Sequence, residues 1–159
     1  MVEITINEAF GNAPPRRPAV LCLQGPDGNT DLIKTEWFTW LNTKHQPMIS
    51  FSMNRNASLG MNLKKGDPLV LAFPPVSEAL LYRNGIRTAT AGKEKQYPAG
   101  VEPVRTEGLD VKIPKGSEVA LACVLAGAYN YPFKKVRIFN CNLEKTLGSQ
   151  ENPDFIPLD

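Results

Sequence analysis

Residues 34–39 combine several groups that can hold a flat heterocyclic ligand. They read Lys-Thr-Glu-Trp-Phe-Thr and come directly after a predicted strand. Backbone groups in such a loop can hydrogen-bond a heterocycle while the aromatic rings pack at its edge. The candidate contact residues are Lys34, Thr35, Glu36, Trp37 and Thr39.

A second segment, Ser52–Ser58, has the chemistry of a phosphate site and leads into a short helix predicted at Ser58–Lys65. The free N–H groups and the positive dipole end of a helix N-terminus attract phosphate. Arg55 adds a fork of donors. The candidate phosphate ligands are Ser52, Asn54, Arg55, Asn56 and Ser58. The same residues also fit an ordinary turn followed by a capped helix, so local chemistry leaves both interpretations open.

Other kinds of chemistry find little support in the sequence. His45 is the only histidine and lies in a polar turn, so no catalytic triad or dyad is predicted. Cys22, Cys123 and Cys141 lie in apolar stretches without a CxxC pair, which predicts buried free thiols in a reducing compartment. No metal-ligand spacing and no glycine-rich phosphate loop is present, so we expect neither a metal site nor catalytic side chains.

Short apolar runs between turn-forming residues predict an antiparallel β protein. The predicted strands are Pro18–Leu23, Thr30–Lys34, Met48–Met53, Pro68–Phe73, Val119–Ala126 and Lys135–Leu143, with a shorter strand near Leu109–Ile113. Helices are predicted at Ser58–Lys65 and Val76–Arg83. The predicted strands do not alternate with helices of similar length, and this argues against a doubly wound parallel sheet. We predict one mainly β domain over residues 1–159, a six-stranded antiparallel Greek-key barrel with short flanking helices.

Composition and charge restrict the partners. The formal net charge is only +2 and is scattered, which argues against a nucleic-acid partner. Met1–Phe10 lacks the pattern of a signal peptide. No apolar run approaches the roughly 20 residues that span a bilayer. A cytoplasmic protein without a membrane partner is therefore expected.

The order of these segments resembles that of the flavin reductase-like, FMN-binding split-barrel family. The matching segments, in order, are Gly25–Asn29, Lys34–Thr39, Pro47–Met53, Arg55–Ser58, Leu59–Lys65, Gly66-Asp67 and Pro68–Phe73. The resemblance is good over Pro18–Phe73 and weaker over Val119–Leu143. It implies a split β-barrel, FMN as cofactor, and a homodimer with the flavin near the subunit interface. It also implies that the isoalloxazine ring lies against Lys34–Thr39 and the phosphate at Ser52–Ser58.

Two departures from the family pattern bear on activity. Many of its reductases carry a nicotinamide-facing histidine in a late hairpin, where this chain has Ala128-Tyr129-Asn130-Tyr131. Glu36-Trp37 also stands where those reductases often have Asn-Ser. Tyr129 and Tyr131 are therefore candidate substrate residues that line a nicotinamide space, cover the flavin or simply anchor the hairpin.

Three functions remain open on this basis. The first is an NAD(P)H-dependent flavin or ferric reductase, in which the cofactor supplies the chemistry. The second is an FMN-binding electron carrier that receives electrons from a redox partner protein. The third is a split-barrel binding protein that has lost its flavin.

Overall fold

The computed structural model describes residues 1–5, 19–25, 28–35, 38–41, 46–54, 63–75, 77–78, 81, 97, 99–132 and 135–149. The strands are β1 (Val2–Glu3), β2 (Ala19–Gln24), β3 (Thr30–Thr35), β4 (Phe38–Leu41), β5 (Met48–Asn54), β6 (Pro68–Phe73), β7 (Pro103–Val104), β8 (Ile113–Pro114), β9 (Val119–Asn130) and β10 (Val136–Gly148). Every pair is antiparallel. Within these ranges no α-helix occurs and no helix is long and apolar enough to cross a membrane.

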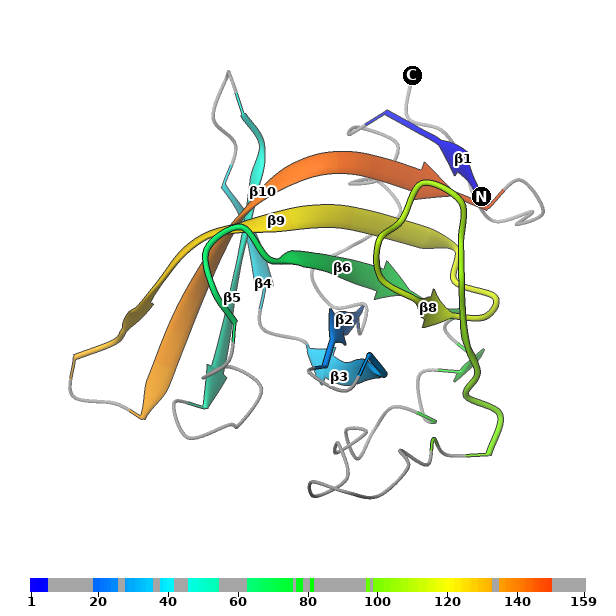
Figure 1. Ribbon diagram of the computed structural model, residues 1–159, viewed down its shortest axis with the longest axis horizontal. Helices are drawn as coiled ribbons and strands as arrows, with labels where there is room; N and C mark the ends of the chain where they lie inside the picture. Colours follow the sequence, from blue (N-terminus) through cyan, green and yellow to red (C-terminus); the bar gives the residue numbers. More distant parts are fainter. Residues whose placement is uncertain are drawn as a thin grey trace.

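The main sheet has eight strands in the order β3-β2-β6-β9-β10-β5-β4, with β1 paired to the far end of β10 (Figure 1). Seven strands laid flat at about 4.8 Å spacing would span roughly 29 Å. The outermost strands, β3 and β4, are joined by only residues 36–37. Three Cα steps reach at most about 11 Å, so the sheet must curl until its two edges approach each other.

β9 and β10 form a long hairpin that bends sharply in the middle (Figure 1). The pairing register shifts between Asn140 and Cys141 and again between Leu143 and Lys145. Each shift is a bulge, which bends the strand and increases its twist. The bend divides the sheet into one half built on β2, β3 and β6 and another built on β4 and β5.

The barrel interior is filled by alternate residues of these strands. Its main members are Leu21, Ile49, Phe51, Leu71, Phe73, Leu121, Cys123, Phe139 and Cys141. Phe51 and Phe139 stack with ring centroids 5.1 Å apart and an interplanar angle of 11°. Phe38 of the short strand β4 packs edge-on against Phe73, with centroids 5.8 Å apart, so β4 faces the same interior.

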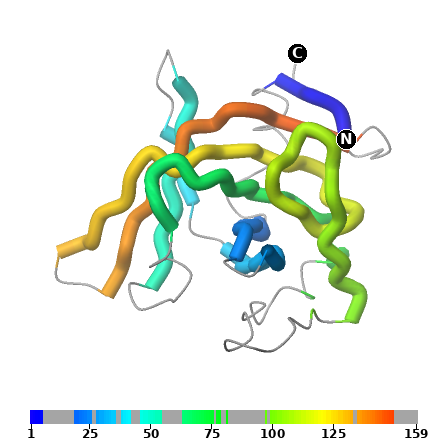
Figure 2. The backbone as a smooth tube through the Cα atoms, in the orientation of Figure 1, coloured from blue at the N-terminus to red at the C-terminus, as the bar shows by residue number. Residues whose placement is uncertain are grey.

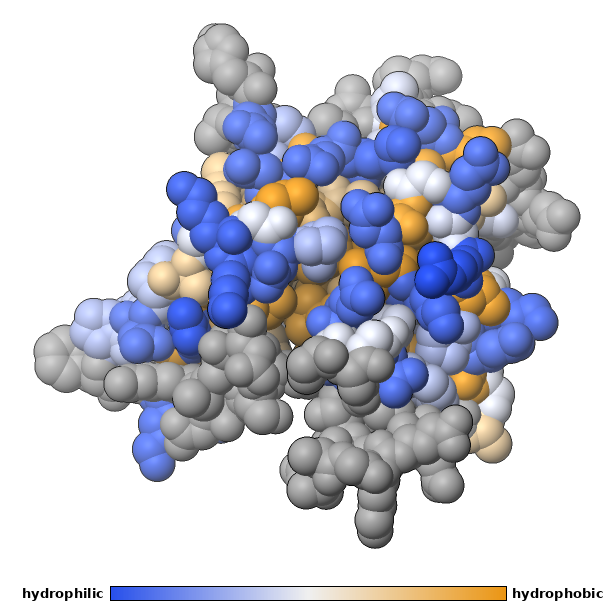
Figure 3. All heavy atoms as spheres, viewed as in Figure 1, coloured by the Kyte–Doolittle hydropathy of each residue, from blue (hydrophilic) through white to orange (hydrophobic). Residues whose placement is uncertain are grey.

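A second apolar layer covers the outer side of β2, β6 and the first part of β9. Residues 99–118 lie across these strands, and Val111 and Ile113 pack on Val20, Val70 and Ala120 (Figure 2). Tyr97 donates a hydrogen bond to the Thr30 carbonyl over 2.6 Å. Apolar atoms are visible in the middle of this view, over β6 and β9, among mostly hydrophilic neighbours (Figure 3). Burial on both faces explains why β2 and β6 are continuous apolar runs rather than alternating ones.

The mainly β, antiparallel prediction is confirmed, but several details differ. The main sheet has eight strands rather than six, because the short strands β4 and β1 join it. The strand expected at Leu109–Ile113 is wrong in position: β8 covers only Ile113–Pro114 and pairs with β7. The five-residue loop between β2 and β3 closes as a hairpin, with the Gly25 amide donating to the Asn29 carbonyl over 2.7 Å.

The two flanking helices are not confirmed. Most of Ser58–Lys65 lies outside the described residues, and its end forms a turn in which the Lys64 amide donates to the Asp67 carboxylate over 2.8 Å. A carboxylate that caps the turn in this way competes with helical hydrogen bonding. Of Val76–Arg83, residues 77, 78 and 81 are described; they have 3₁₀ geometry, and the Glu78 amide donates to the Pro75 carbonyl.

Candidate functional site

The ends of β5, β9 and β10 meet at one edge of the barrel and bring several predicted site residues together. We call this edge the rim, formed by Ser52–Asn54, Tyr129–Tyr131 and Val136–Ile138. Ser52 lies opposite Ile138, which in turn lies opposite Tyr129. Residues directly opposite each other in a sheet share a face. Ser52, a candidate phosphate ligand, and Tyr129, a candidate substrate residue, therefore lie on the same side of the sheet.

That side is the outer face of the half built on β4 and β5. By register it carries Thr39, Leu41, Met48, Ser50, Ser52, Asn54, Gly127, Tyr129, Val136, Ile138, Asn140 and Asn142. Not one of these residues is charged. At its centre the Ser50 hydroxyl donates to Asn140 Oδ1 over 2.8 Å. We call this set the uncharged outer face.

A bulge decides on which face Tyr129 lies. Leu125 pairs with Cys141 and points inward, whereas Gly127 pairs with Asn140, which leaves Ala126 as the extra residue. A one-residue shift moves every later side chain to the opposite face. Tyr129 is therefore on the outer face, with 51% of its surface exposed, instead of inside the barrel.

One cation, Arg137, lies on the inward side of the rim. The residues directly opposite it on the neighbouring strands are uncharged. Arg137 lies between Met53 on β5 and Asn130 on β9. Its Cζ atom is 5.6 Å from the centroid of the Phe139 ring. Its Nε atom is buried and has no hydrogen-bond partner among the described residues. Arg137 is not among the predicted site residues, although the alternation of Phe139, Cys141 and Leu143 would have placed it on the inward face.

The remaining predicted residues are distributed as follows. Thr39 is on β4, opposite Ser50, and belongs to the uncharged outer face. Lys34 and Thr35 end β3 at the other edge of the sheet, and Thr35 is buried opposite Ala19. Tyr131 follows β9 and its amide donates to the Val136 carbonyl over 2.9 Å. The predictions for Glu36, Trp37, Arg55, Asn56 and Ser58 lie outside the described residues.

The three cysteines are buried free thiols, as the sequence predicts. Burial raises the pKa of Cys141 to about 12 and raises the pKa values of Cys22 and Cys123 well above the ordinary range. Such thiols stay protonated and are poor nucleophiles. Among the described residues no group of His, Cys, Asp and Glu side chains has the arrangement of a metal site.

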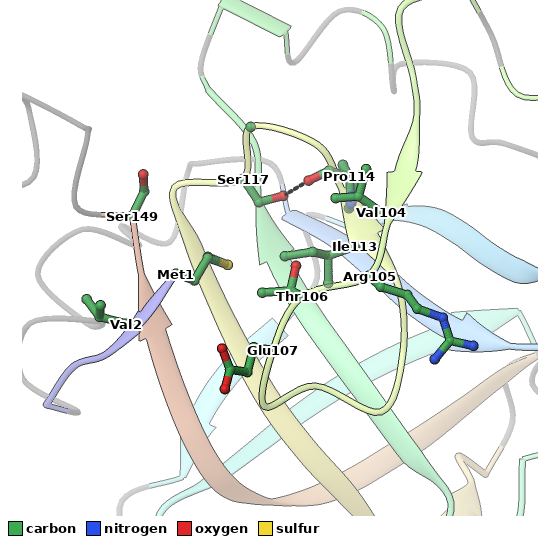
Figure 4. Close-up of a pocket in the computed structure, with 11 residues that line it drawn as sticks. Met1, Val2, Val104, Arg105, Thr106, Glu107, Ile113, Pro114, Ser117 and Ser149 are labelled. Carbon is green, nitrogen blue, oxygen red and sulfur yellow. Dashed lines mark hydrogen bonds between the residues drawn. The ribbon is translucent and has the colours of Figure 1, made fainter.

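A separate cavity of about 560 Å³ lies at the opposite end of β10 (Figure 4). Its walls include Met1 and Val2, the loop of Arg105–Glu107, and Ser149 after β10. The Ser117 hydroxyl at its edge is already used, because it donates to the Pro114 carbonyl over 2.6 Å. Arg105 and Glu107 point in different directions in Figure 4, so the lining does not focus one charge on the space.

Known structures resemble this arrangement. A split barrel domain protein of Shewanella frigidimarina NCIMB 400 superposes with a TM-score of 0.72 at 11% identity, covering 89% of this chain and 72% of that one. An FMN-binding domain of a flavin reductases-like enzyme from Shewanella baltica OS155 gives 0.71 at 17% identity, covering 99% and 82%. Flavoredoxin of Desulfovibrio vulgaris (Miyazaki F) gives 0.70 at 13% identity, covering 98% and 82%.

No family model and no curated protein matches the chain by sequence. At identities this low the superpositions establish the fold. The chain thus has the fold of the flavin reductase-like, FMN-binding split-barrel proteins, in agreement with the resemblance seen in its sequence.

Proposed function

We propose that this protein is an FMN-binding flavoprotein, an oxidoreductase of the NAD(P)H-dependent flavin or ferric reductase type. The observation that carries the proposal is the split-barrel fold shared with flavin-binding proteins over 98–99% of this chain. We also propose that residues 1–159 form one flavin-binding domain. The three reduced, buried cysteines support a cytoplasmic location.

The donor set at the rim fits a phosphorylated flavin. Ser52 and Asn54 offer a hydroxyl and an amide at the end of β5, directly before the Arg55–Ser58 segment. Hydroxyl, amide and guanidinium groups are the usual partners of phosphate. We assign the phosphate to Ser52, Asn54, Arg55, Asn56 and Ser58, and the ring to Lys34, Thr35, Glu36, Trp37 and Thr39. Bound FMN would supply the redox chemistry, while the chain binds and orients it.

We propose a homodimer that forms through the uncharged outer face. The outer side of the other half of the sheet is covered by residues 99–118, whereas no described segment covers this face in the same way. Leu41 and Tyr129 on it are 39% and 51% exposed. Low charge and exposed aromatic surface are characteristic of interface cores, and a two-fold axis brings the same patch together from both copies.

A second candidate, an FMN-binding electron carrier that accepts electrons from a partner protein, is favoured by one observation. The rim has tyrosines rather than a histidine beside the proposed flavin, and both Tyr129 and Tyr131 are about half exposed. An aromatic ring that covers the flavin would exclude nicotinamide. A tyrosine beside the ring would leave nicotinamide room to stack.

The absorption spectrum of the purified protein tests flavin binding, because bound FMN gives a yellow protein with flavin bands. Anaerobic addition of NADH or NADPH then separates the two candidates: bleaching supports the reductase, and a stable oxidised spectrum supports the carrier. Arg55→Ala tests the phosphate assignment and should weaken FMN binding by roughly 1.5–3 kcal/mol. A colourless protein that does not bind added FMN would overturn the whole proposal.

A further inference from the structure

Gly127 is a glycine that the described part of the chain does not itself require. It lies inside β9, and its backbone φ is not in the left-handed region that favours glycine. A Cβ atom added there would meet no atom of the described residues within 4 Å, its chain neighbours apart. A glycine inside a strand weakens the strand and often marks a place where another molecule approaches closely. We call the open space over this residue the gap.

Tyr129 stands beside the gap on the same face of the sheet. It is two residues along β9, roughly 7 Å away at about 3.3 Å per residue. Ala128 lies between the two and packs on the barrel interior, so its neighbours are on the outer face. Tyr129 is 51% exposed. The uncharged outer face therefore has a projecting aromatic ring directly next to an unfilled space.

Asn140 adds a polar group at the edge of the gap. It lies opposite Gly127 on one side and opposite Ser50 on the other. Its Oδ1 atom accepts a hydrogen bond from the Ser50 hydroxyl over 2.8 Å, which fixes the orientation of the amide. The Nδ2 group has two N–H donors, and a tyrosine hydroxyl can accept from such a donor. The gap thus suits an aromatic ring that carries a hydroxyl.

We propose that Tyr129 of each subunit fills the gap over Gly127 of the partner subunit, with its hydroxyl accepting from Asn140; this inference rests on the homodimer proposed above. In a two-fold interface, a residue i that contacts residue j of the other copy is itself matched by j contacting i. A projecting ring next to a gap satisfies this condition, because each copy has both parts. The face carries no charged residue, so no like charges oppose each other across the contact.

Sedimentation equilibrium of the full chain measures the Kd of the dimer. Tyr129→Ala removes the ring, and Gly127→Val fills the gap. Because the dimer contains the contact twice, we expect each variant to raise the Kd by about 100-fold, about tenfold for each contact. Tyr129→Phe keeps the ring and loses only the hydroxyl, so it should raise the Kd by only about tenfold.

A mixture of Gly127→Val and Tyr129→Ala distinguishes this contact from a general effect on the interface. In the mixed dimer one contact is as in the wild type, and the other places the truncated side chain against the filled gap, so nothing collides. We expect its Kd to lie within about tenfold of the wild-type value, below that of either variant alone. Tyr131→Ala is the matched control: it makes the same truncation at a 47% exposed residue beyond the end of β9. Mixed with Gly127→Val it retains one collision and should dimerise more weakly than the first mixture.

The outcomes separate this contact from the homodimer itself. A wild-type Kd in both Tyr129→Ala and Gly127→Val, or a mixed dimer no tighter than either variant alone, overturns the contact and leaves the homodimer standing. Circular dichroism checks that each variant folds, and Gly127→Ala, which adds a single methyl group, replaces the valine variant if that one does not. A wild-type protein that stays monomeric overturns the homodimer and this contact with it, while flavin binding is tested separately by the absorption spectrum.

Discussion

The buried thiols make the stability of this protein depend on alkaline pH. The pKa of Cys141 is raised to about 12, so the folded state keeps the proton that the unfolded chain releases near pH 9. The stabilisation is complete below pH 9 and decreases from there toward pH 12, by up to about 1.4 kcal/mol per pH unit for one thiol. Urea unfolding at pH 8 and pH 10 should show this decrease. A Cys141→Ala variant should show a shallower one, and an identical pH dependence would contradict the assignment.

The two rim tyrosines should influence flavin reduction without supporting the fold. Tyr129 and Tyr131 are 51% and 47% exposed, so truncation to Ala removes little packing. We expect at least one variant to change the rate of anaerobic flavin reduction by NADH. A faster rate identifies a lid over the flavin, and a slower rate identifies a wall of the nicotinamide space. If both variants reduce at the wild-type rate, the hairpin is only scaffold.

Strands buried on both sides are the elements that the sequence predicts best. Ala19–Leu23 and Leu69–Phe73 are continuous apolar runs, and the structure places them in the middle of the sheet with both faces covered. Shorter strands are harder to predict. β1 has two residues and β4 has four, too few to show a period, and they form because β10 and β5 offer paired edges.

The site is only partly predictable because its residues come together through register. Ser52 and Tyr129 are far apart in the sequence and share a face only after the extra residue Ala126 shifts the pairing. Alternation continued from Leu121, Cys123 and Leu125 would place Tyr129 inside the barrel. Register depends on where bulges form, and a local pattern does not specify that. In contrast, the alternation of Phe139, Cys141 and Leu143 along the sequence is enough to predict that Arg137 faces inward.

The segment of residues 99–118 should contribute to stability as a structural layer. Ile113 belongs to this segment, is 1% exposed and packs against the sheet. Ile113→Ala should lower the free energy of unfolding by about 2–5 kcal/mol, the range for a buried truncation that leaves a cavity. Leu109→Ala in the same segment removes as many carbon atoms from a half-buried site and should cost less. Urea denaturation of both variants measures the difference; equal losses would show that burial on the sheet does not determine the effect.

The whole chain has two outer sheet surfaces, and their different chemistry predicts its assembly. One surface is covered by the chain itself, through Val111 and Ile113. The other, the uncharged outer face, has Ile138 on its middle strand β10, between Ser52 and Tyr129. Around a two-fold axis such a face meets its own copy, so no like charges oppose each other. A charge introduced there is placed near its own counterpart and also loses its hydration.

Light scattering at micromolar concentration should therefore give the mass of a dimer for the wild-type protein. Ile138→Lys should give a monomer, because two buried lysines repel across the axis and neither has a partner charge. Asp110→Asn changes the net charge by the same single unit at an exposed position of residues 99–118 and should remain dimeric. A monomeric wild type would refute the homodimer. A dimeric Ile138→Lys variant of unchanged affinity would keep the homodimer but move its interface away from the uncharged outer face.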